Sequence, residues 1–418
     1  MSTSGPIVTL EEHFMSKAGE ATLDKKTATL KHFEASGLWD KFTELGPVRI
    51  KHMDAGRVTL QVISHGPGEL SPDQCRAAND QLAEAVRSHP DRFAGFASLP
   101  MGHPEEAAAE LQRMCSGAAG VKFVGALVEN HTEAGRYYEG PEYDVLWRIA
   151  SETLDVPIYI HPTWPSDDVY DAGFRSATVP DGITLAISAY GFGWHSDVAM
   201  HIIKLFGAGV FDRFPKLKII IGHFGEMIPF MLQRIERTSA RWEISRTFRQ
   251  VWDENLWLTT SGNWSLDPLA TILRNTKKDR ILYSVDYPFA ATEDGLKWLE
   301  ELEASGLDRH ELLQDRAHRL IVPVVDDVSH VVDVCVTDRL WGEQIVRHEL
   351  DALGWTTRNR IKYRRQILND NATLQSGVAL AHIHHDVSLS TSNINNGDLV
   401  FFDVQLFKFF AEWERSDG

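Results

Sequence analysis

The chain has 418 residues, which is the length of one barrel-sized domain with an added segment, or of two domains. Of these residues 43% are hydrophobic and 24% are charged, which is the composition of an ordinary globular protein. Its formal charge of −17 argues against a nucleic acid or an anionic membrane as partner, because both are bound by clustered lysines and arginines. No run approaches the ~18 apolar residues that cross a bilayer, and the opening MSTSGP lacks a secretory signal. We therefore expect a cytoplasmic protein, in which Cys75, Cys115 and Cys335 are reduced.

The first predicted strand lies in IVTLEEHF (7–14) and runs directly into charged residues. Val8 and Leu10 are good strand formers, and Glu11 and His13 come after them two residues apart, so that their side chains point the same way. Such a pair can hold a metal ion or a proton. One pair is weak support, because acidic residues at a strand end are usually solvated. The interpretation depends on whether the other strands end in similar residues.

Seven more strands are predicted from β-branched and apolar runs, and helix-like segments separate them. The strands are expected at 58–64, 92–99, 121–128, 156–160, 217–222, 256–260 and 280–285, and the clearest helices at 72–88, 104–115, 196–209 and 292–305. Eight buried strands alternating with helices over roughly 300 residues predict a (β/α)8 barrel, an α/β TIM barrel, with a doubly wound open sheet as the alternative.

The alternation ends near residue 321, so we assign residues 1–322 to the barrel and residues 323–418 to a C-terminal extension of uncertain structure and unknown role. The extension holds a histidine-rich stretch, His382, His384, His385 and Asp386. These residues could bind a metal ion, but a short histidine tract on an alternating strand is more often ordinary surface.

Acidic residues and histidines stand at the ends of four of the predicted strands. Besides Glu11 and His13, these are His161 after the fifth strand, His223 and Glu226 after the sixth, and Asp286 after the eighth. The carboxyl ends of the strands meet at one rim of a barrel, where its active site lies. Glu, His, His and Asp suit Zn²⁺, Mn²⁺ or a similar divalent ion such as Mg²⁺. We assign Glu11, His13, His161 and Asp286 to the metal.

His223 is then the remaining titratable group of the rim. Glu226, three residues later, can orient its ring if a helix starts at the Gly225 turn. Arg234 lies two turns along the same predicted helix and could anchor a carboxylate. A surface position for Arg234 is equally compatible with the sequence.

The chain resembles the amidohydrolase superfamily, in particular its metal-dependent, non-oxidative decarboxylases of hydroxylated benzoates such as γ-resorcylate, 2,3-dihydroxybenzoate and salicylate. The resemblance covers about residues 7–321 and rests on LEEHF, HPDRFAGFASLP, FVGALV, IYIHP, GVFDRFP, IIIGHFGEMIPFMLQRI, LTTSGN and DRILYSVDYPF. It implies that Glu11, His13, His161 and Asp286 are metal ligands and that His223 and Glu226 form an acid/base network with the aspartate.

Two positions separate this chain from hydrolytic relatives. Superfamily hydrolases commonly begin with two histidines one residue apart, and binuclear ones carry a lysine at the end of the fourth strand. Here Glu11 takes the first position, and Lys122 lies at the beginning of the fourth strand. The resemblance therefore implies one divalent metal ion, with Zn²⁺ expected first and Mn²⁺ or Mg²⁺ as alternatives.

The implied reaction is the decarboxylation of a hydroxybenzoate by protonation of the ring carbon, with Asp286, His223 and Glu226 as catalytic residues. Phe14, Trp164 and Phe289 could clamp the aromatic carboxylate, although each is equally compatible with a place in the core. The family implies a homodimer or a homotetramer. The segment SAYGFGWHSDVAMH (188–201) differs from the family pattern, and the extension has no counterpart in it, so the identity of the substrate stays open.

Two other functions remain possible from the sequence. One is a metal-dependent amidohydrolase or lactonase, and the other is a barrel that has lost activity and serves as a binding protein. The intact set of Glu11, His13, His161, His223 and Asp286 weighs against the second.

Overall fold

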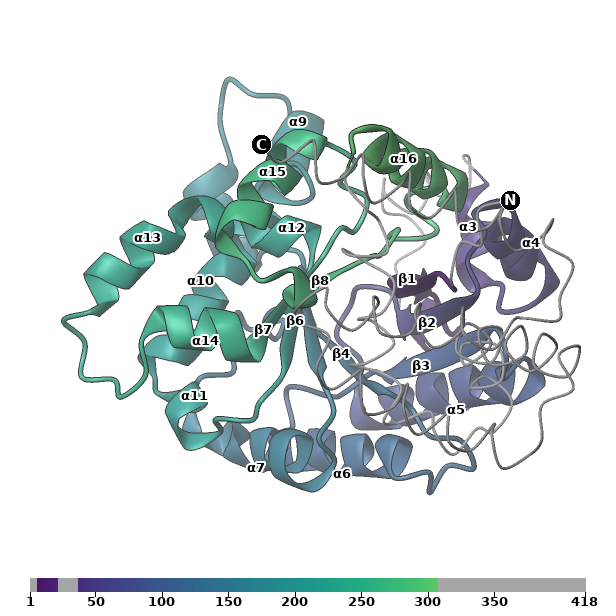
Figure 1. The fold of residues 1–418 in the computed structure, drawn as a ribbon. Helices are drawn as coiled ribbons and strands as arrows, with labels where there is room; N and C mark the ends of the chain where they lie inside the picture. The colour runs from purple at the N-terminus through teal and green to yellow at the C-terminus, as the bar shows by residue number, and fades with distance from the viewer. Residues whose placement is uncertain (1–5, 22–36, 307–418) are drawn as a thin grey trace, which may run out of the picture. The chain divides into compact units, whose positions relative to one another are not determined.

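Eight parallel strands form a single sheet in chain order, and helices surround it (Figure 1). The structure is a computed structural model that describes residues 6–21 and 37–306. The strands are β1 (Val8–Phe14), β2 (Leu60–His65), β3 (Phe93–Ala97), β4 (Gly125–Glu129), β5 (Ile158–His161), β6 (Ile219–Ile221), β7 (Leu256–Thr259) and β8 (Ile281–Leu282). The predicted (β/α)8 barrel is confirmed, and all eight predicted strands are present. The predictions for the extension, residues 323–418, lie outside the described residues.

The helices alternate with the strands as the sequence predicts. Their bounds are α1 (Lys17–Glu20), α3 (Leu38–Thr43), α4 (Pro47–Ala55), α5 (Pro72–Ser88), α6 (Pro104–Cys115), α7 (Asp144–Arg148), α8 (Asp167–Val169), α9 (Asp181–Ser188), α10 (Gly193–Gly207), α11 (Val210–Arg213), α12 (His223–Glu226), α13 (Ile228–Ser239), α14 (Phe248–Asn255), α15 (Leu266–Asn275) and α16 (Thr292–Ala304), with short 3₁₀ or π turns at η1 (Pro141–Tyr143), η2 (Ile149–Thr153), η3 (Tyr170–Phe174) and η4 (Lys278–Arg280). α5 and α6 have the predicted bounds, because each begins with proline in its first turn. Within the described residues, no helix has both the length and the apolar character needed to span a membrane.

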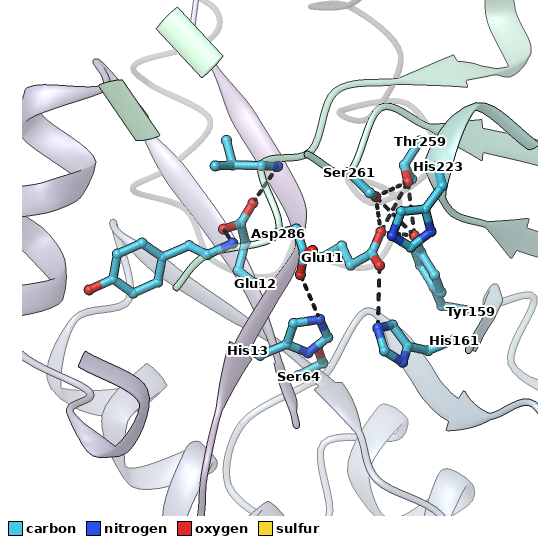
Figure 2. Close-up of polar contacts among 12 residues, drawn as sticks. Glu11, Glu12, His13, Ser64, Tyr159, His161, His223, Thr259, Ser261 and Asp286 are labelled. Atoms are coloured by element: carbon cyan, nitrogen blue, oxygen red, sulfur yellow. Dashed lines mark hydrogen bonds and ion pairs between the residues drawn. The ribbon is translucent and has the colours of Figure 1, made fainter. Parts of the chain in front are cut away.

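β1 continues through its charged residues instead of ending before them. All seven residues of Val8–Phe14 are buried, and the register against β2 shifts between Thr9 and Glu12. Because successive side chains of a strand point to opposite sides, Glu11 and Glu12 face away from each other (Figure 2). Glu11 and His13 share one side, as predicted, and Glu12 takes a separate structural role.

Glu12 joins the first strand to the segment after the last. Its Oε1 accepts a hydrogen bond from the backbone N–H of Val285 at 3.0 Å and its Oε2 one from Tyr287 at 3.1 Å (Figure 2). The N–H of His13 donates to the Tyr287 carbonyl at 2.6 Å. Burial raises the pKa of Glu12 to about 8, against the opposing effect of these two backbone donors. The Glu12 side chain therefore supplies acceptors where β8 is too short to pair with β1.

The segment after β6, labelled α12 (His223–Glu226) in Figure 1, has the backbone of a left-handed turn and not of a regular helix. Five consecutive residues have positive φ angles: His223 (46°), Phe224 (57°), Gly225 (85°), Glu226 (50°) and Met227 (66°). A Cβ on Gly225 would lie 3.0 Å from a Leu258 methyl carbon, so glycine is favoured here for space as well as for conformation. The expected helix does not start at Gly225. α13 begins at Ile228, and His223 and Glu226 are placed by the turn that precedes it.

Candidate metal and proton-transfer site

Three predicted metal ligands come together at the carboxyl ends of the strands. Each of Glu11, His13 and His161 offers one ligand atom, and these atoms lie within 4.8 Å of one another, with all three residues buried. The Nε2 of His161 is 3.5 Å from Oε1 of Glu11. Oδ1 of Asp286, the fourth predicted ligand, lies 3.3 Å from Nε2 of His13 (Figure 2). The fold therefore brings together residues from β1, β5 and the segment after β8.

Two atoms of this cluster need a partner. Within the described residues, Oε1 of Glu11 and Nε2 of His13 are buried and make no hydrogen bond, and their ion-pair contacts, at 3.5 Å and 3.3 Å, are with other predicted ligands. Burial also lowers the pKa of His161 well below its ordinary value, which keeps this imidazole neutral and able to donate a lone pair. A buried acceptor or donor without a partner is costly, and a divalent cation would satisfy these atoms at once. The residues present fit a metal ion.

Three hydroxyl groups hold the other oxygen of Glu11. Oε2 accepts from the hydroxyls of Tyr159, Thr259 and Ser261, with the Thr259 contact at 3.1 Å (Figure 2). A Cβ on Gly222 would lie 3.2 Å from this oxygen and 2.9 Å from the Tyr159 hydroxyl, so the close approach requires glycine. Saturating Oε2 leaves Oε1 as the oxygen that is available to a cation. Such supporting contacts orient metal ligands.

These hydroxyl residues were not among the predicted site residues. Tyr159 stands two positions before His161 on β5 and therefore on the same side of the strand. That spacing could have indicated Tyr159. Thr259 is the last residue of β7, and Ser261 lies in the turn that follows it, with a positive φ of 35°. Ser64 was also missed: its hydroxyl lies 3.3 Å from Nδ1 of His13, so Nδ1 is engaged there while Nε2 faces Asp286.

His223 and Glu226 form the predicted pair, and a third residue joins them. Nδ1 of His223 donates to Oε1 of Glu226 at 2.7 Å. Nδ1 of His195, on α10, donates to Oε2 of the same carboxylate at 2.6 Å. The His195 and His223 rings meet edge to face with centroids 4.6 Å apart. The carboxylate of Glu226 thus bridges two imidazoles, and no spacing in the sequence indicated His195.

The charges of the site favour a proton on His223. Burial opposes the charged ring, but Glu226 and Glu11 outweigh it and raise the pKa of His223 to about 10. Burial likewise opposes the Glu226 carboxylate, yet the neighbouring His223 and His195 hold the pKa of Glu226 well below its ordinary range. Burial raises the pKa of Glu11, and the His223 charge opposes that effect. The neighbouring carboxylates therefore favour the protonated form of His223, whose Nδ1 is hydrogen-bonded to Glu226 beside the candidate metal ligands.

Aromatic side chains lie beside the cluster. Phe289 is 39% exposed, its ring is 5.8 Å from that of His13, and it also meets Phe42 edge to face. Trp164 is half-buried and packs edge to face against Trp194 at 5.1 Å. Trp194 in turn lies 6.4 Å from His161. Of the two residues predicted to clamp a substrate ring, Phe289 lies beside the metal ligand His13, and Trp164 is separated from His161 by Trp194.

The other two predicted substrate-binding residues have different surroundings. Phe14 is 1% exposed and belongs to the hydrophobic core, where its ring meets His65 edge to face at 5.3 Å. Arg234 lies on α13 with an exposed side chain. The substrate-binding roles of both residues stay predictions.

Comparison with known proteins finds a family model and several decarboxylases that are similar to the chain. A family model described as "Amidohydrolase" matches residues 32–321. The decarboxylase orsB of Emericella nidulans is 50% identical over 323 residues, which is 75% of this chain and 95% of that protein. The γ-resorcylate decarboxylase of Polaromonas sp. is 34% identical over 335 residues, covering 75% of this chain and 97% of that protein.

A solved structure has the same fold. The dihydroxybenzoic acid decarboxylase of Polaromonas sp. JS666, with bound manganese and the inhibitor 2-nitroresorcinol, superposes with a TM-score of 0.65 at 29% identity. The alignment covers 76% of this chain and 97% of that one.

Proposed function

Because the chain belongs to the amidohydrolase family, we propose that it is a metal-dependent decarboxylase that converts a hydroxylated benzoate to the phenol and CO2. The substrate is of the 2,3-dihydroxybenzoate, γ-resorcylate or salicylate type. The observation that carries the proposal is the arrangement of two groups at one rim. Glu11, His13 and His161 bring candidate ligand atoms together, and beside them Nδ1 of His223 is hydrogen-bonded to Glu226.

The reaction requires an acid at the ring carbon. Direct loss of CO2 from an aromatic ring would leave an aryl carbanion, and prior protonation of the carbon that bears the carboxylate avoids it. An ortho hydroxyl makes that carbon electron-rich enough to accept a proton. The bond to the carboxylate then breaks, its electron pair returns to the ring and CO2 leaves. The enzyme must therefore bind the carboxylate and hold a proton near the ring.

The metal site supplies substrate positioning. Glu11, His13, His161 and Asp286 would hold one divalent cation, and this cation would provide a Lewis acid for the carboxylate and the neighbouring hydroxyl oxygen. Our sequence expectation is Zn²⁺. The bound manganese of the Polaromonas relative supports Mn²⁺ as the first alternative, and the mixed nitrogen and oxygen ligands are compatible with either ion.

The proton comes from the His223 pair. The Glu226 carboxylate holds Nδ1 of His223 at 2.7 Å, and His223 carries a second ring nitrogen that can exchange a proton. In the proposed step, Asp286 delivers the proton to the ring carbon and is supplied by His223, and solvent restores the proton afterwards. Phe289 and Trp164 are the aromatic side chains that we propose contact the substrate ring, with Arg234 and Phe14 as the further predicted substrate-binding residues.

We also propose that the enzyme is a homodimer or a homotetramer. α10 and α13 border an open groove of about 790 Å³, with Met200, Met231 and Trp242 among its lining residues. Beside it, Phe230 is 58% exposed. A face that carries both a groove and a protruding aromatic ring can pair with a second copy of itself. Phe230→Asp should lower the mass measured by analytical ultracentrifugation, and an unchanged mass would exclude this face as the interface.

Residues 323–418 are proposed to be separate from the catalytic domain. Relatives match three quarters of this chain but 95–97% of their own length, which supports a barrel complete without the extension. A cytoplasmic location stays a prediction from the sequence.

Product analysis tests the reaction. The metal-loaded protein, incubated with 2,3-dihydroxybenzoate, γ-resorcylate and salicylate, should convert at least one of them to its phenol and CO2. In D2O, one deuterium should replace the carboxylate on the ring, which neither an amidohydrolase nor a lactonase would produce. Turnover of lactones or amides without decarboxylation of any hydroxybenzoate would overturn the proposal.

A further inference from the structure

We propose that His195 is a positioning residue for proton transfer: it holds the second oxygen of Glu226 and thereby fixes the carboxylate that orients His223. The kinetic part of this inference rests on the proposed decarboxylase function. The structural part, that His195 fixes His223 through Glu226, does not depend on the substrate.

The first support is that both oxygens of the Glu226 carboxylate are hydrogen-bonded to imidazole rings. Glu226 is fully buried, and each of its oxygens accepts one imidazole N–H, His223 at 2.7 Å and His195 at 2.6 Å. Removing His195 would leave Oε2 of a buried carboxylate without that donor. Such an oxygen lowers its free energy by turning toward another donor, and His223 is the other side chain that donates to this carboxylate among the described contacts. The geometry of the His223 pair therefore depends on His195.

The second support is the conformation of the backbone that carries the pair. His223 and Glu226 lie in a left-handed turn, with φ angles of 46° and 50°, and not in a regular helix. Helical spacing cannot set the relative position of their side chains here. Hydrogen-bond partners must set it, and His195 supplies one of them from a different element, α10.

The third support is that the His195 ring is held on both edges. Its Nε2 lies 3.2 Å from the Tyr190 carbonyl oxygen while Nδ1 meets Glu226. Its side chain is 21% exposed, and its ring packs edge to face against His223. The segment between α9 and α10 thus fixes the His195 ring, and the ring in turn fixes the position of the Glu226 carboxylate. His195, His223 and Glu226 themselves offer ligand atoms within 4.8 Å of one another, but none of them belongs to the predicted metal ligands Glu11, His13, His161 and Asp286.

The two ring contacts can be separated by substitution. The side-chain nitrogen of asparagine occupies nearly the position of Nδ1, and that of glutamine nearly the position of Nε2. His195→Asn should keep the donor to Glu226, and His195→Gln should keep the donor to the Tyr190 carbonyl. His195→Leu removes both. Asn and Gln are therefore matched controls for each other.

The expected kinetic result is a loss of turnover that only asparagine rescues. His195→Leu and His195→Gln should lower kcat about 10- to 100-fold with little change in KM, whereas His195→Asn should stay within about threefold of the native kcat. All three variants and the native protein should bind one equivalent of Mn²⁺. Rescue by Gln instead of Asn, or equal activity of all three, would overturn the inference. The inference would also be overturned if the native protein bound a second equivalent of Mn²⁺ and the variants did not. In that case His195, His223 and Glu226 would form a metal site.

A spectroscopic measurement keeps the inference testable without turnover. In protein labelled with ¹⁵N-histidine, the His223 Nδ1–H resonance should be downfield in the native protein and in His195→Asn, and it should move in His195→Leu and His195→Gln. An unchanged resonance in the Leu variant would show that His195 does not fix the pair. If this resonance moves as expected but no hydroxybenzoate is decarboxylated, the proposed function fails while the positioning role of His195 stands.

Discussion

His13 and Asp286 come from the first strand and from the segment after the last, and their Nε2 and Oδ1 atoms lie 3.3 Å apart. A cation bound to both would link the two ends of the barrel sequence, where Glu12 already supplies acceptors to Val285 and Tyr287. Metal binding and stability should therefore be coupled. A ligand that binds only the folded state stabilises it by about 2.7 kcal/mol at 100 times its Kd.

Removal of the metal should lower both activity and Tm. We expect prolonged chelation to abolish decarboxylation, and Zn²⁺ or Mn²⁺ to restore it together with the original Tm. The measurements are calorimetry and turnover during titration with chelator, with metal content determined in the same samples. Full activity in verifiably metal-free protein would rule out Glu11, His13, His161 and Asp286 as the functional metal site.

The hydroxyl contacts to Glu11 predict a loss of metal affinity in Tyr159→Phe. Without this hydroxyl, Oε2 loses one of its three donors and the carboxylate is less firmly oriented. We expect Kd for Mn²⁺ to rise by roughly 10-fold, as measured by competition with a chelating dye. Tyr143→Phe is a matched control, because its hydroxyl donates to the Met101 carbonyl at 2.9 Å. Equal affinity in the two variants would contradict the role of Tyr159.

His223→Asn should separate acid catalysis from metal binding. The asparagine nitrogen can still donate to Glu226 in place of Nδ1, but the titratable Nε2 is lost. Turnover should fall on the order of 10²-fold or more, with metal content near normal. Metal analysis and steady-state kinetics on the same preparation check this. A variant that no longer binds metal would mean that His223 is itself a ligand.

Glu12→Gln should destabilise the fold. The amide can accept one of the two backbone N–H groups, from Val285 or Tyr287, but its NH2 group faces the other donor. A buried unpaired group costs about 1–3 kcal/mol, which urea unfolding should detect as a lower midpoint. Glu105→Gln, on the exposed side of α6, controls for the change in charge. Equal midpoints for the two variants would argue against Glu12 as the acceptor that joins the ends of the sheet.

We expect the buried, neutral ring of His201 to make the folded protein less stable in acid. Its Nδ1 donates to Asn130 at 3.0 Å and its Nε2 accepts from the Tyr138 N–H at 3.3 Å, so the buried ring is neutral. Burial, together with Lys204 and His131, lowers the pKa of His201 to about 3. The unfolded chain, with an ordinary pKa near 6.5, binds more protons below that pH. The contribution of His201 to the stability of the folded state is therefore fully present above pH 6.5 and is lost as the pH falls toward 3.

Between pH 6.5 and pH 5, the free energy of unfolding should fall by about 2 kcal/mol because of His201. It should be measured as the difference in pH dependence between the native protein and His201→Gln, whose amide oxygen can accept from Tyr138. The native protein should lose more stability over this interval. Parallel curves would show that His201 does not contribute.

The sequence alone determined the elements and the candidate metal ligands. Parallel strands buried on both sides appear as continuous apolar runs, which is why β1 to β8 were recognisable, and proline in the first turn marked the starts of α5 and α6. Alternation along β1 placed Glu11 and His13 on one side, and the barrel brought His161 to the same rim. These features depend on local periodicity and on the rule that the carboxyl ends of all strands of a barrel meet at one rim.

Only the tertiary structure decided which residues support the site. His195 reaches Glu226 across 31 positions, and Ser261 reaches Glu11 across 250. Neither contact has a periodicity that a sequence can display, because it depends on where separate elements come together. From the sequence, the pairing of His223 with Glu226 depends on a helix start at the Gly225 turn, whereas the structure places both residues in a left-handed turn and begins the helix at Ile228. Local patterns determined which residues reach the rim, and the packing of distant elements determined how they are held there.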